Sequence, residues 1–180
     1  FLYIFFILFF VIGAFVGSFL GVLVNRIPKG KNFITGRSIC DFCKKELNWN
    51  DLIPVISFLS LKGACRYCHS RLSFFYPSIE VLSGIIFALT YLFVSSFNLD
   101  LFYYLFIFSA LIVVFFTDLK YGIIPDKILF PIILISFVWI FINYQSELLN
   151  HLLSAFSASV FFIIISLLYF SFRKKVAMGG

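Results

Sequence analysis

The chain has 180 residues, of which 62% are hydrophobic, 22% are aromatic and only 12% are charged, and its mean hydropathy is +1.08. Soluble domains are about 45–50% apolar and about 25% charged, so too few polar residues are present to cover this chain in water. The net charge of +6 would favour nucleic acid in a soluble protein. Basic residues also flank membrane segments, so we predict an all-α, polytopic membrane protein with no nucleic-acid partner.

Five segments are apolar enough to be transmembrane helices, which need about 20 apolar residues. They cover, to within a few residues, positions 1–24, 77–97, 101–117, 128–142 and 152–172. The fourth is short, which is compatible with a small tilt or with ends capped by its neighbours. The domains expected are a first helix (1–24), a loop module (25–76) and a helical core (77–180) that forms part of a larger bundle. No internal repeat is evident.

Lys and Arg residues are confined to alternate loops. Nine lie in the loop of residues 25–76, two lie between the third and fourth segments, and three follow the fifth segment. The loops around 98–100 and 143–150 contain none. Because basic loops stay in the cytoplasm, we expect the N-terminus outside and the 25–76 loop inside. The basic residues of this loop are expected to meet anionic lipid.

All four cysteines lie in the 25–76 loop as two CxxC pairs, Cys40 with Cys43 and Cys65 with Cys68. Each pair lets two thiolates face one metal ion, and two pairs complete a tetrahedral zinc site. The reducing cytosol argues against disulfides. A four-sulfur site has no open position, so the zinc would be structural, and it would supply folding energy that a short loop lacks. We therefore predict a small, zinc-ribbon-like module.

Three other interpretations of the cysteine loop stay open. A thioredoxin-like redox pair is one, although it needs a βαβ setting that the sequence does not show. Four free thiols without a metal are the second. The third is that His69, next to Cys68, acts as a substitute ligand.

Three acidic residues lie at or within membrane segments, where a carboxyl group is a functional candidate because its burial costs several kcal/mol. Asp118 is the first, at the end of the apolar run 101–116. A carboxyl group at this position is either part-buried and functional, or a helix-end residue that reaches water beside Lys120. Position alone does not decide between the two.

The other two acidic candidates are Asp126 and Glu80. Asp126 follows Pro125 and precedes the fourth segment, which is typical of a helix N-cap. Glu80 lies about one turn inside the second segment. It is either structural, as an acceptor for Arg71 or another loop cation, or it faces a substrate.

Several short motifs follow one another in a specific order and spacing. They are residues 17–20 (GSFL), 25–28 (NRIP), 51–57 (DLIPVIS), 61–68 (LKGACRYC), 76–84 (YPSIEVLSG), 117–118 (TD) and 124–126 (IPD). Together with the four-cysteine loop, they resemble the bacterial type IV prepilin peptidase family, from about residue 13 to the end.

The resemblance implies an intramembrane aspartyl protease of the bacterial inner membrane. Members of the family cleave the basic leader from type IV prepilins and pseudopilins at the cytoplasmic membrane face. Many of them also methylate the new N-terminus with S-adenosylmethionine. Asp118 matches the first of two catalytic aspartates. Arg26, Glu80 and Asp126 lie in matching motifs and are candidates for structural or substrate-facing roles.

The sequence departs from the family pattern at two places. The family's second catalytic Asp follows a Gly-x-Gly sequence, and this chain stops at Met178-Gly179-Gly180. We therefore expect a fragment whose second Asp lies beyond Gly180, because Asp126 is too near Asp118 in sequence to replace it. Gly21 stands where many relatives carry Asn, which puts methylation in question.

Two functions of other classes compete with the protease. A non-catalytic membrane scaffold of a secretion or pilus assembly would use the zinc module for interaction and would not need Asp118. A transporter would need acidic residues at mid-membrane, and Asp118 lies too near an interface for that role.

Overall fold

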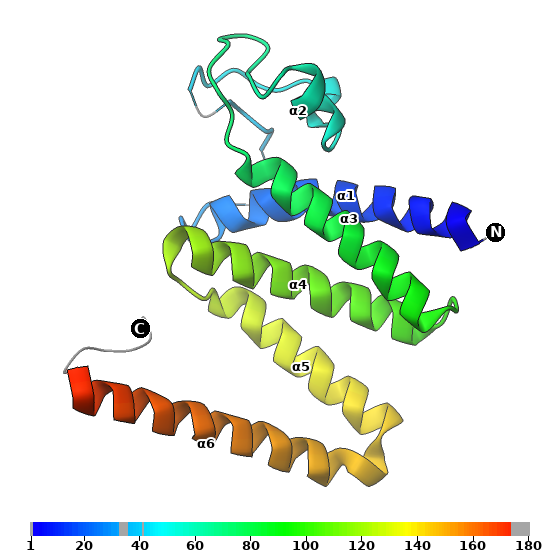
Figure 1. Ribbon diagram of the computed structural model, residues 1–180, viewed down its shortest axis with the longest axis vertical. Coiled ribbons are helices and arrows are strands. Elements are labelled where there is room, and N and C mark those ends of the chain that lie inside the picture. The colour runs from blue at the N-terminus through cyan, green and yellow to red at the C-terminus, as the bar shows by residue number, and fades with distance from the viewer. Residues whose placement is uncertain (1, 33–35, 41, 174–180) are drawn as a thin grey trace. The chain divides into compact units, whose positions relative to one another are not determined.

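A computed structural model describes residues 2–32, 36–40 and 42–173, and its regular structure is helical apart from two isolated β-bridges (Figure 1). The elements are α1 (Leu2–Arg26), η1 (Trp49–Leu52), α2 (Ile56–Ser60), α3 (Phe75–Val94), α4 (Leu99–Tyr121), α5 (Asp126–Asn143), η2 (Gln145–Glu147) and α6 (Leu148–Arg173). Within the described residues, five of these helices are long and apolar enough to cross a membrane, which confirms the predicted fold class. Predictions that rest on Phe1, Lys174, Lys175 and residues 178–180 lie outside the described residues.

The helix ends differ from the predicted ones by a few residues, for local reasons. α3 ends at Val94 because Ser95 adopts a left-handed φ of 53° and its N–H bonds to the Tyr91 carbonyl. α4 begins where the Asn98 side chain accepts from the backbone N–H of the helix's third residue at 3.0 Å, as an N-cap does. It runs to Tyr121 and ends at Gly122, whose φ of 64° is easily adopted by glycine.

The chain divides into two compact units, residues 1–125 and 126–180. In the first unit, α1, α3 and α4 pack against one another, and the cysteine loop connects α1 to α3 (Figure 1). The second unit contains α5, η2 and α6. α5 has a proline, Pro131, inside its second turn, where the ring removes one helical hydrogen bond.

Glycines at every fourth residue of α1 bring this helix into close contact with α3. Gly13, Gly17 and Gly21 share one helix face, a spacing that is typical of packed membrane helices and that the sequence analysis left unused. A Cβ added at Gly13 would lie 2.6 Å from the carbonyl oxygen of Ser83, and one at Gly17 would lie 2.8 Å from the Cα of Glu80. The glycine face of α1 therefore packs directly on the backbone of α3 and on the side chains of Ser83 and Phe87.

We expect Gly17→Ala to lower the free energy of unfolding by about 1–3 kcal/mol, because the added methyl group meets backbone atoms that cannot move aside. Gly21→Ala is the matched control, since its Cβ would lie 3.6 Å from a ring carbon of Tyr76, an ordinary contact distance. Thermal unfolding in detergent micelles measures both. Equal melting temperatures for the two variants would contradict the close packing at Gly17.

Aromatic rings fill the end of the first unit opposite Arg26. The Phe9 ring stacks on Tyr91 with 4.6 Å between centroids, and Phe97 packs against both rings. Leu101, at the start of α4, is fully buried against this cluster. The cluster joins all three long helices at one end, which leaves the other end to be held by polar contacts.

Candidate functional site

The first CxxC pair lies in a tight β-knuckle. The Cys40 N–H donates to the carbonyl of Lys45 at 2.9 Å, and the Lys44 N–H donates back to the carbonyl of Cys40 at 3.0 Å. An isolated antiparallel bridge joins Ile39 to Glu46 around the knuckle. The turn closes through Lys44, whose φ of 59° is left-handed.

The second CxxC pair repeats this knuckle 25 residues later in the chain. The Cys65 N–H donates to the carbonyl of Ser70 at 2.9 Å, and the His69 N–H donates to the carbonyl of Cys65 at 3.0 Å. The bridge joins Ala64 to Arg71, and His69 has the left-handed φ of 54°. The repeat is one of backbone structure, which the sequence analysis did not predict. The two ten-residue runs share only the cysteines and the final leucine, too little for recognition without hydrogen bonds.

The two knuckles bring their four sulfur atoms together. The Sγ atoms of Cys40, Cys43, Cys65 and Cys68 all lie within 4.8 Å of one another, and those of Cys40 and Cys68 are 3.9 Å apart. Four Zn–S bonds of about 2.3 Å in a tetrahedron place the sulfurs about 3.8 Å apart. All four residues are free cysteines, and a disulfide would need a separation of about 2.05 Å. The donor set and its spacing therefore fit a structural zinc ion.

The surroundings of the sulfurs act in opposite directions on two of the thiols. A hydrogen bond from the Lys45 backbone lowers the pKa of Cys43, but desolvation and the nearby sulfurs of Cys68 and Cys40 outweigh it and raise this pKa to about 11. Cys40 and Cys65 are buried, whereas Cys43 and Cys68 are exposed. The Ser70 hydroxyl, 3.0 Å from the Cys68 sulfur, and the Ser70 backbone N–H lower the pKa of Cys68 to about 6 by hydrogen bonding to its charged form. Hydrogen bonds of this kind orient metal ligands.

The structure bears differently on the three other interpretations of the cysteine loop, which are a His69 ligand, a redox pair and four free thiols. His69 occupies the turn position that Lys44 occupies in the first knuckle, and the four sulfurs form the cluster without it. Each CxxC pair lies in a knuckle rather than at a strand-to-helix turn, which does not fit a thioredoxin-like redox site. The choice between bound zinc and four free thiols stays a prediction.

An ion pair between Asp51 and Arg66 joins η1 to the second knuckle. The Arg66 Nε donates to Asp51 Oδ1 at 2.7 Å, and Asp51 Oδ2 accepts from the Asn48 N–H at 3.2 Å. The Asp51 side chain is only 3% exposed, whereas that of Arg66 is 48% exposed. The Asn48 side chain also donates to the Tyr67 hydroxyl at 2.9 Å. The buried carboxylate is thus satisfied from both sides.

Arg66→Ala is expected to destabilise the module by about 1.5–3 kcal/mol, because it removes a charged hydrogen bond from a buried carboxylate. Arg37→Ala is the control. Its pair with Glu46 has the same kind of partners at 3.0 Å, but the two side chains are 65% and 59% exposed, so its loss should cost less than about 1 kcal/mol. The rate of zinc release to a chelator measures the difference. Equal rates for the two variants would count against the Asp51 pair.

Asp118 lies in the last turn of α4. Phe116 and Thr117 before it are 7% and 0% exposed, whereas Asp118 itself is exposed. Each residue turns the helix by about 100°, so the carboxyl group leaves the packed face of the first unit. Of the two alternatives left open by its position, the structure shows the exposed carboxyl group at the helix end and not the part-buried one.

A polar cluster that the sequence analysis missed holds the same end of α4. Asn25 Oδ1 accepts from the Lys120 ammonium group at 2.5 Å and from the Tyr121 hydroxyl at 3.1 Å. The Asn25 amide donates to the Gly21 carbonyl at 2.8 Å. The Lys120 ammonium group also lies 4.3 Å from the centroid of the Phe75 ring, within cation–π range. Lys120 therefore binds α1 and α3.

Glu80 faces the cysteine module. Its Oε2 accepts from the backbone N–H of Val55 at 2.8 Å, so the expectation of Arg71 or another loop cation as its partner was wrong. The physical reason is the turn at Val55, which has φ 61° and ψ −48°. In this turn the Ile56 N–H bonds to the Pro54 carbonyl at 2.5 Å, a rare γ-turn geometry, and the Val55 N–H is left for the carboxylate.

Arg26 and Asp126 are the remaining candidates for structural or substrate-facing roles. The Arg26 guanidinium donates to the backbone carbonyls of Asn32 at 3.2 Å and Arg37 at 3.1 Å, which shapes the start of the loop. Asp126 is the first residue of α5, so the N-cap position falls on Pro125, one residue earlier than predicted. A carboxylate in the first turn still favours the helix through its dipole.

Two family profiles match successive parts of the chain. The profile described as "Bacterial Peptidase A24 N-terminal domain" matches residues 11–94, and the one described as "Type IV leader peptidase family" matches residues 105–180. The chain belongs to the type IV prepilin peptidase family. This family consists of aspartic prepilin peptidases, and the chain is a multi-pass membrane protein of a bacterial family.

Curated relatives of this family are named prepilin leader peptidase/N-methyltransferase. The Bacillus subtilis protein is 39% identical over 104 residues, which is 58% of this chain and 42% of the relative. The Vibrio cholerae protein is 28% identical over 186 residues, which is 99% of this chain and 73% of the relative. The match to the Myxococcus xanthus protein is 32% identical and spans 61% of this chain and 32% of the relative. The chain thus spans less than half the length of two of these relatives. No solved structure gives a significant match to the chain.

Proposed function

We propose that the complete protein is an intramembrane aspartyl endopeptidase that removes the leader peptide from type IV prepilins and pseudopilins at the cytoplasmic membrane face. The position of Asp118 carries this proposal. It is an exposed carboxyl group in the last turn of a membrane-spanning helix, within the residues matched by the leader peptidase profile. The printed names of the relatives supply the substrate class.

The proposed chemistry needs two carboxyl groups, Asp118 and a second Asp expected beyond Gly180. Two close carboxyl groups cannot both ionise cheaply, so they share a proton. The ionised group takes a proton from a water molecule as its oxygen attacks the scissile carbonyl. The protonated group donates to the developing oxyanion, and the leaving amine is then protonated. Asp118 lies at a helix end, where water reaches it.

The neighbours of Asp118 support a positioning role for the polar cluster. Lys120 and Tyr121 lie within one turn of Asp118 and bond to Asn25 of α1. These contacts fix the last turn of α4 against the first helix. The Asp118 carboxyl group therefore lies on an ordered helix end that does not fray. Precise placement of a reacting group is a large part of enzymatic rate enhancement.

The proposal places the cysteine module and the Arg26 end of α1 in the cytoplasm. Nine basic residues lie in the loop that contains the module, and the loops on the opposite side carry none, as the positive-inside rule requires. The basic loop would lie near anionic lipid. A prepilin would approach with its basic leader in the cytoplasm and its hydrophobic stem among the helices.

Zinc enters the proposal as a structural ion. The four cysteine thiolates would fill its coordination sphere, which leaves no position for a substrate or for an attacking water. When bound, the ion supplies folding energy to the two knuckles. The reaction is therefore assigned to carboxyl groups rather than to the metal.

The relatives are also named N-methyltransferases, and these names are the support for a second proposed activity, methylation of the new N-terminus. S-adenosylmethionine would be the methyl donor. Transfer of a labelled methyl group to the cleaved pilin measures it. Cleaved pilin that stays unlabelled would restrict the proposal to proteolysis.

Leader cleavage by the purified complete protein tests the main proposal. The zinc-loaded protein is reconstituted in lipid vesicles with a prepilin, and mass spectrometry follows the pilin N-terminus. A peptidase produces a shortened pilin that begins at one defined residue. The scaffold alternative leaves the prepilin intact, and an intact prepilin beside a folded, zinc-loaded protein would overturn the proposal.

A further inference from the structure

The segment of residues 52–61 is an apolar run inside the otherwise basic loop. Its sequence, LIPVISFLSL, has no charged residue between Asp51 and Lys62, and it contains α2. The side chains of Ile56 and Leu59 are 64% and 67% exposed, and that of Phe74, just before α3, is 78% exposed. Single exposed apolar residues are normal on a soluble surface, but here they accompany an uncharged run beside a membrane helix.

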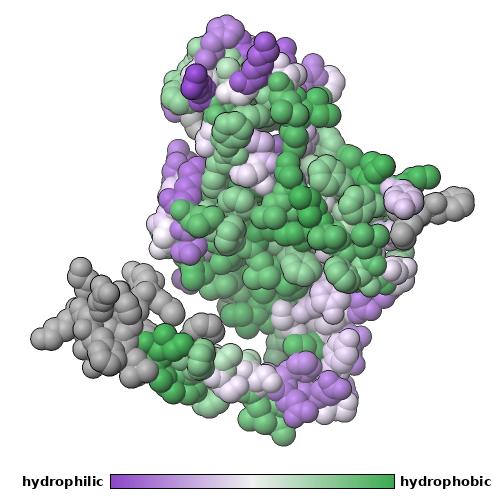
Figure 2. Space-filling view, in the orientation of Figure 1, coloured by the Kyte–Doolittle hydropathy of each residue, from purple (hydrophilic) through white to green (hydrophobic). Residues whose placement is uncertain are grey.

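Apolar residues cover the surface around α2. Figure 2 shows hydrophobic residues on the part of the module that carries α2 and on the membrane helices next to it, while hydrophilic residues gather at the far end of the module. Ile56 and Leu59 are three residues apart in α2, so they share one face of the helix. α2 therefore has an exposed apolar face on the part of the module that carries it.

The depth of α2 follows from the contact between Glu80 and Val55. Glu80 lies five residues past Phe75 in α3, or about 7 Å along the axis at about 1.5 Å per residue. Its Cα is next to Gly17 of α1, nine residues before Arg26 and therefore about 13 Å from that end of the helix. The Val55 N–H bonds to this carboxylate, so α2 starts beside the apolar part of the membrane helices.

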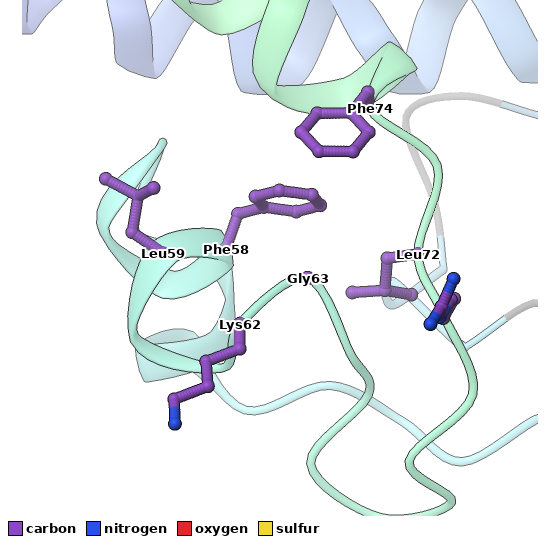
Figure 3. A pocket seen from close by; sticks show the side chains of 7 residues that line it. Phe58, Leu59, Lys62, Gly63, Leu72 and Phe74 are labelled. Atoms are coloured by element: carbon purple, nitrogen blue, oxygen red, sulfur yellow. The ribbon is translucent and has the colours of Figure 1, made fainter.

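A shallow cavity next to α2 has apolar walls and cationic residues at its edge. Figure 3 shows the Phe58 and Phe74 rings next to each other, with 5.1 Å between their centroids and their planes tilted by 59°, and Leu72 pointing toward the same space. Lys62 and Arg71 complete the lining. Long basic side chains next to an inserted apolar face keep their charges at the headgroup layer.

We propose that residues 52–61 are an interfacial membrane segment, in which the α2 face formed by Ile56 and Leu59, together with Phe74 just before α3, contacts the acyl chains of the bilayer. Lys62 and Arg71 meet the phosphates of anionic lipids at the same surface. The occupant of this face is therefore the lipid bilayer. An amphipathic segment with an apolar face and a basic edge binds membranes in this manner. The inference goes beyond the proposed function, because it concerns how the module is seated and not what the protein cleaves.

Tryptophan fluorescence in the complete, zinc-loaded protein tests this placement. Trp49→Phe and Trp139→Phe remove the two tryptophans of these 180 residues, and any tryptophan elsewhere in the complete protein is replaced by Phe as well. Leu59→Trp then places a single probe on the proposed lipid-facing surface. The protein is reconstituted in vesicles of anionic phospholipid with brominated acyl chains. Bromolipids are expected to quench this probe strongly, and aqueous acrylamide weakly.

Phe42→Trp in the same background is the matched control. Phe42 is 64% exposed, close to the exposure of Leu59, but it lies in the first knuckle. Its probe is expected to be quenched by acrylamide and not by bromolipids. If Leu59→Trp loses its zinc and fails to fold, Ile56→Trp provides a second probe on the same face.

Three results would overturn the inference. Strong acrylamide quenching at position 59 would place the face in water, and protection from both quenchers would place it against protein. Equal bromolipid quenching at positions 59 and 42 would remove the assignment to this segment. None of these readouts depends on leader cleavage, so a failure of the inference is distinguishable from a failure of the proposed function.

Discussion

Replacing Asp118 with Asn is expected to lower the rate of leader cleavage by about 10²–10⁴-fold in the complete protein, the usual contribution of a general acid–base group. The amide can neither take a proton from water nor share one with a second carboxyl group. Its shape is nearly unchanged, and the side chain is exposed, so the fold should be unaffected. The effect should fall on kcat and leave KM nearly unchanged, as for a group that acts in the transition state.

Asp126→Asn is the matched control for this variant. Asp126 is also an acidic residue at the end of a membrane-spanning helix, but it is the first residue of α5 and belongs to the other compact unit. Its substitution should leave cleavage within a few fold of the unmodified protein. Undiminished cleavage by Asp118→Asn would remove Asp118 from the proposed chemistry and favour the scaffold alternative.

A second comparison separates catalysis from positioning at the same helix end. Lys120 contacts Asn25 and the Phe75 ring, and it does not reach the reacting atoms in the proposal. A positioning residue of this kind acts through geometry, so its loss costs less than loss of the carboxyl group and is partly restored by the conservative Arg substitution. At Asp118 no substitution without a carboxyl group restores cleavage, because the reaction needs a titratable oxygen.

The parts of the fold that follow from hydropathy were predicted from the sequence. Five apolar runs became five helices within a few residues, because a segment that must satisfy its backbone in lipid has few alternatives to a helix. The spacing of Cys40, Cys43, Cys65 and Cys68 also sufficed to predict a single cluster. Two thiolates three residues apart can bind one metal ion, and two such pairs complete a four-sulfur site.

The contacts that position the site were not predictable in the same way. Asn25 and Lys120 are 95 residues apart, and nothing in either helix shows which residue of the other helix will lie opposite. Glu80 was paired with the wrong partner because charge alone pointed to Arg71, whereas the available donor is a backbone N–H freed by the turn at Val55. A sequence does not indicate which backbone N–H groups will be free to bond to a side chain.

The close packing at Gly17 is an intermediate case. The repeat of glycine at every fourth residue of α1 is visible in the sequence and is a known signal of helix contact in membranes. It indicates that a partner helix approaches but does not identify that partner. The structure supplies α3, and with it the position of Glu80 beside the module.

Cys65→Ser is expected to abolish zinc binding and unfold the cysteine module. Cys65 is 3% exposed, so the serine hydroxyl would replace a buried thiolate ligand and bind zinc far more weakly. In small zinc domains the ion contributes about 10–16 kcal/mol of binding free energy that is also folding free energy, and this module has little buried apolar surface to replace it. Bound zinc, measured by metal analysis, should fall to background, and the loop should become sensitive to protease.

His69→Ala separates the ligand set from its neighbours. His69 adjoins Cys68 but lies outside the four-sulfur cluster, so its variant should keep its zinc and resist protease. Loss of zinc in His69→Ala would show that histidine is a ligand, and retained zinc in Cys65→Ser would contradict the four-sulfur site.

The Val55 N–H of the module bonds to Glu80 of α3, so an unfolded module also leaves that carboxylate without this donor. Loss of zinc should therefore lower the stability of the α1–α3 pair as well, and unchanged helix stability in Cys65→Ser would show that the two parts fold independently.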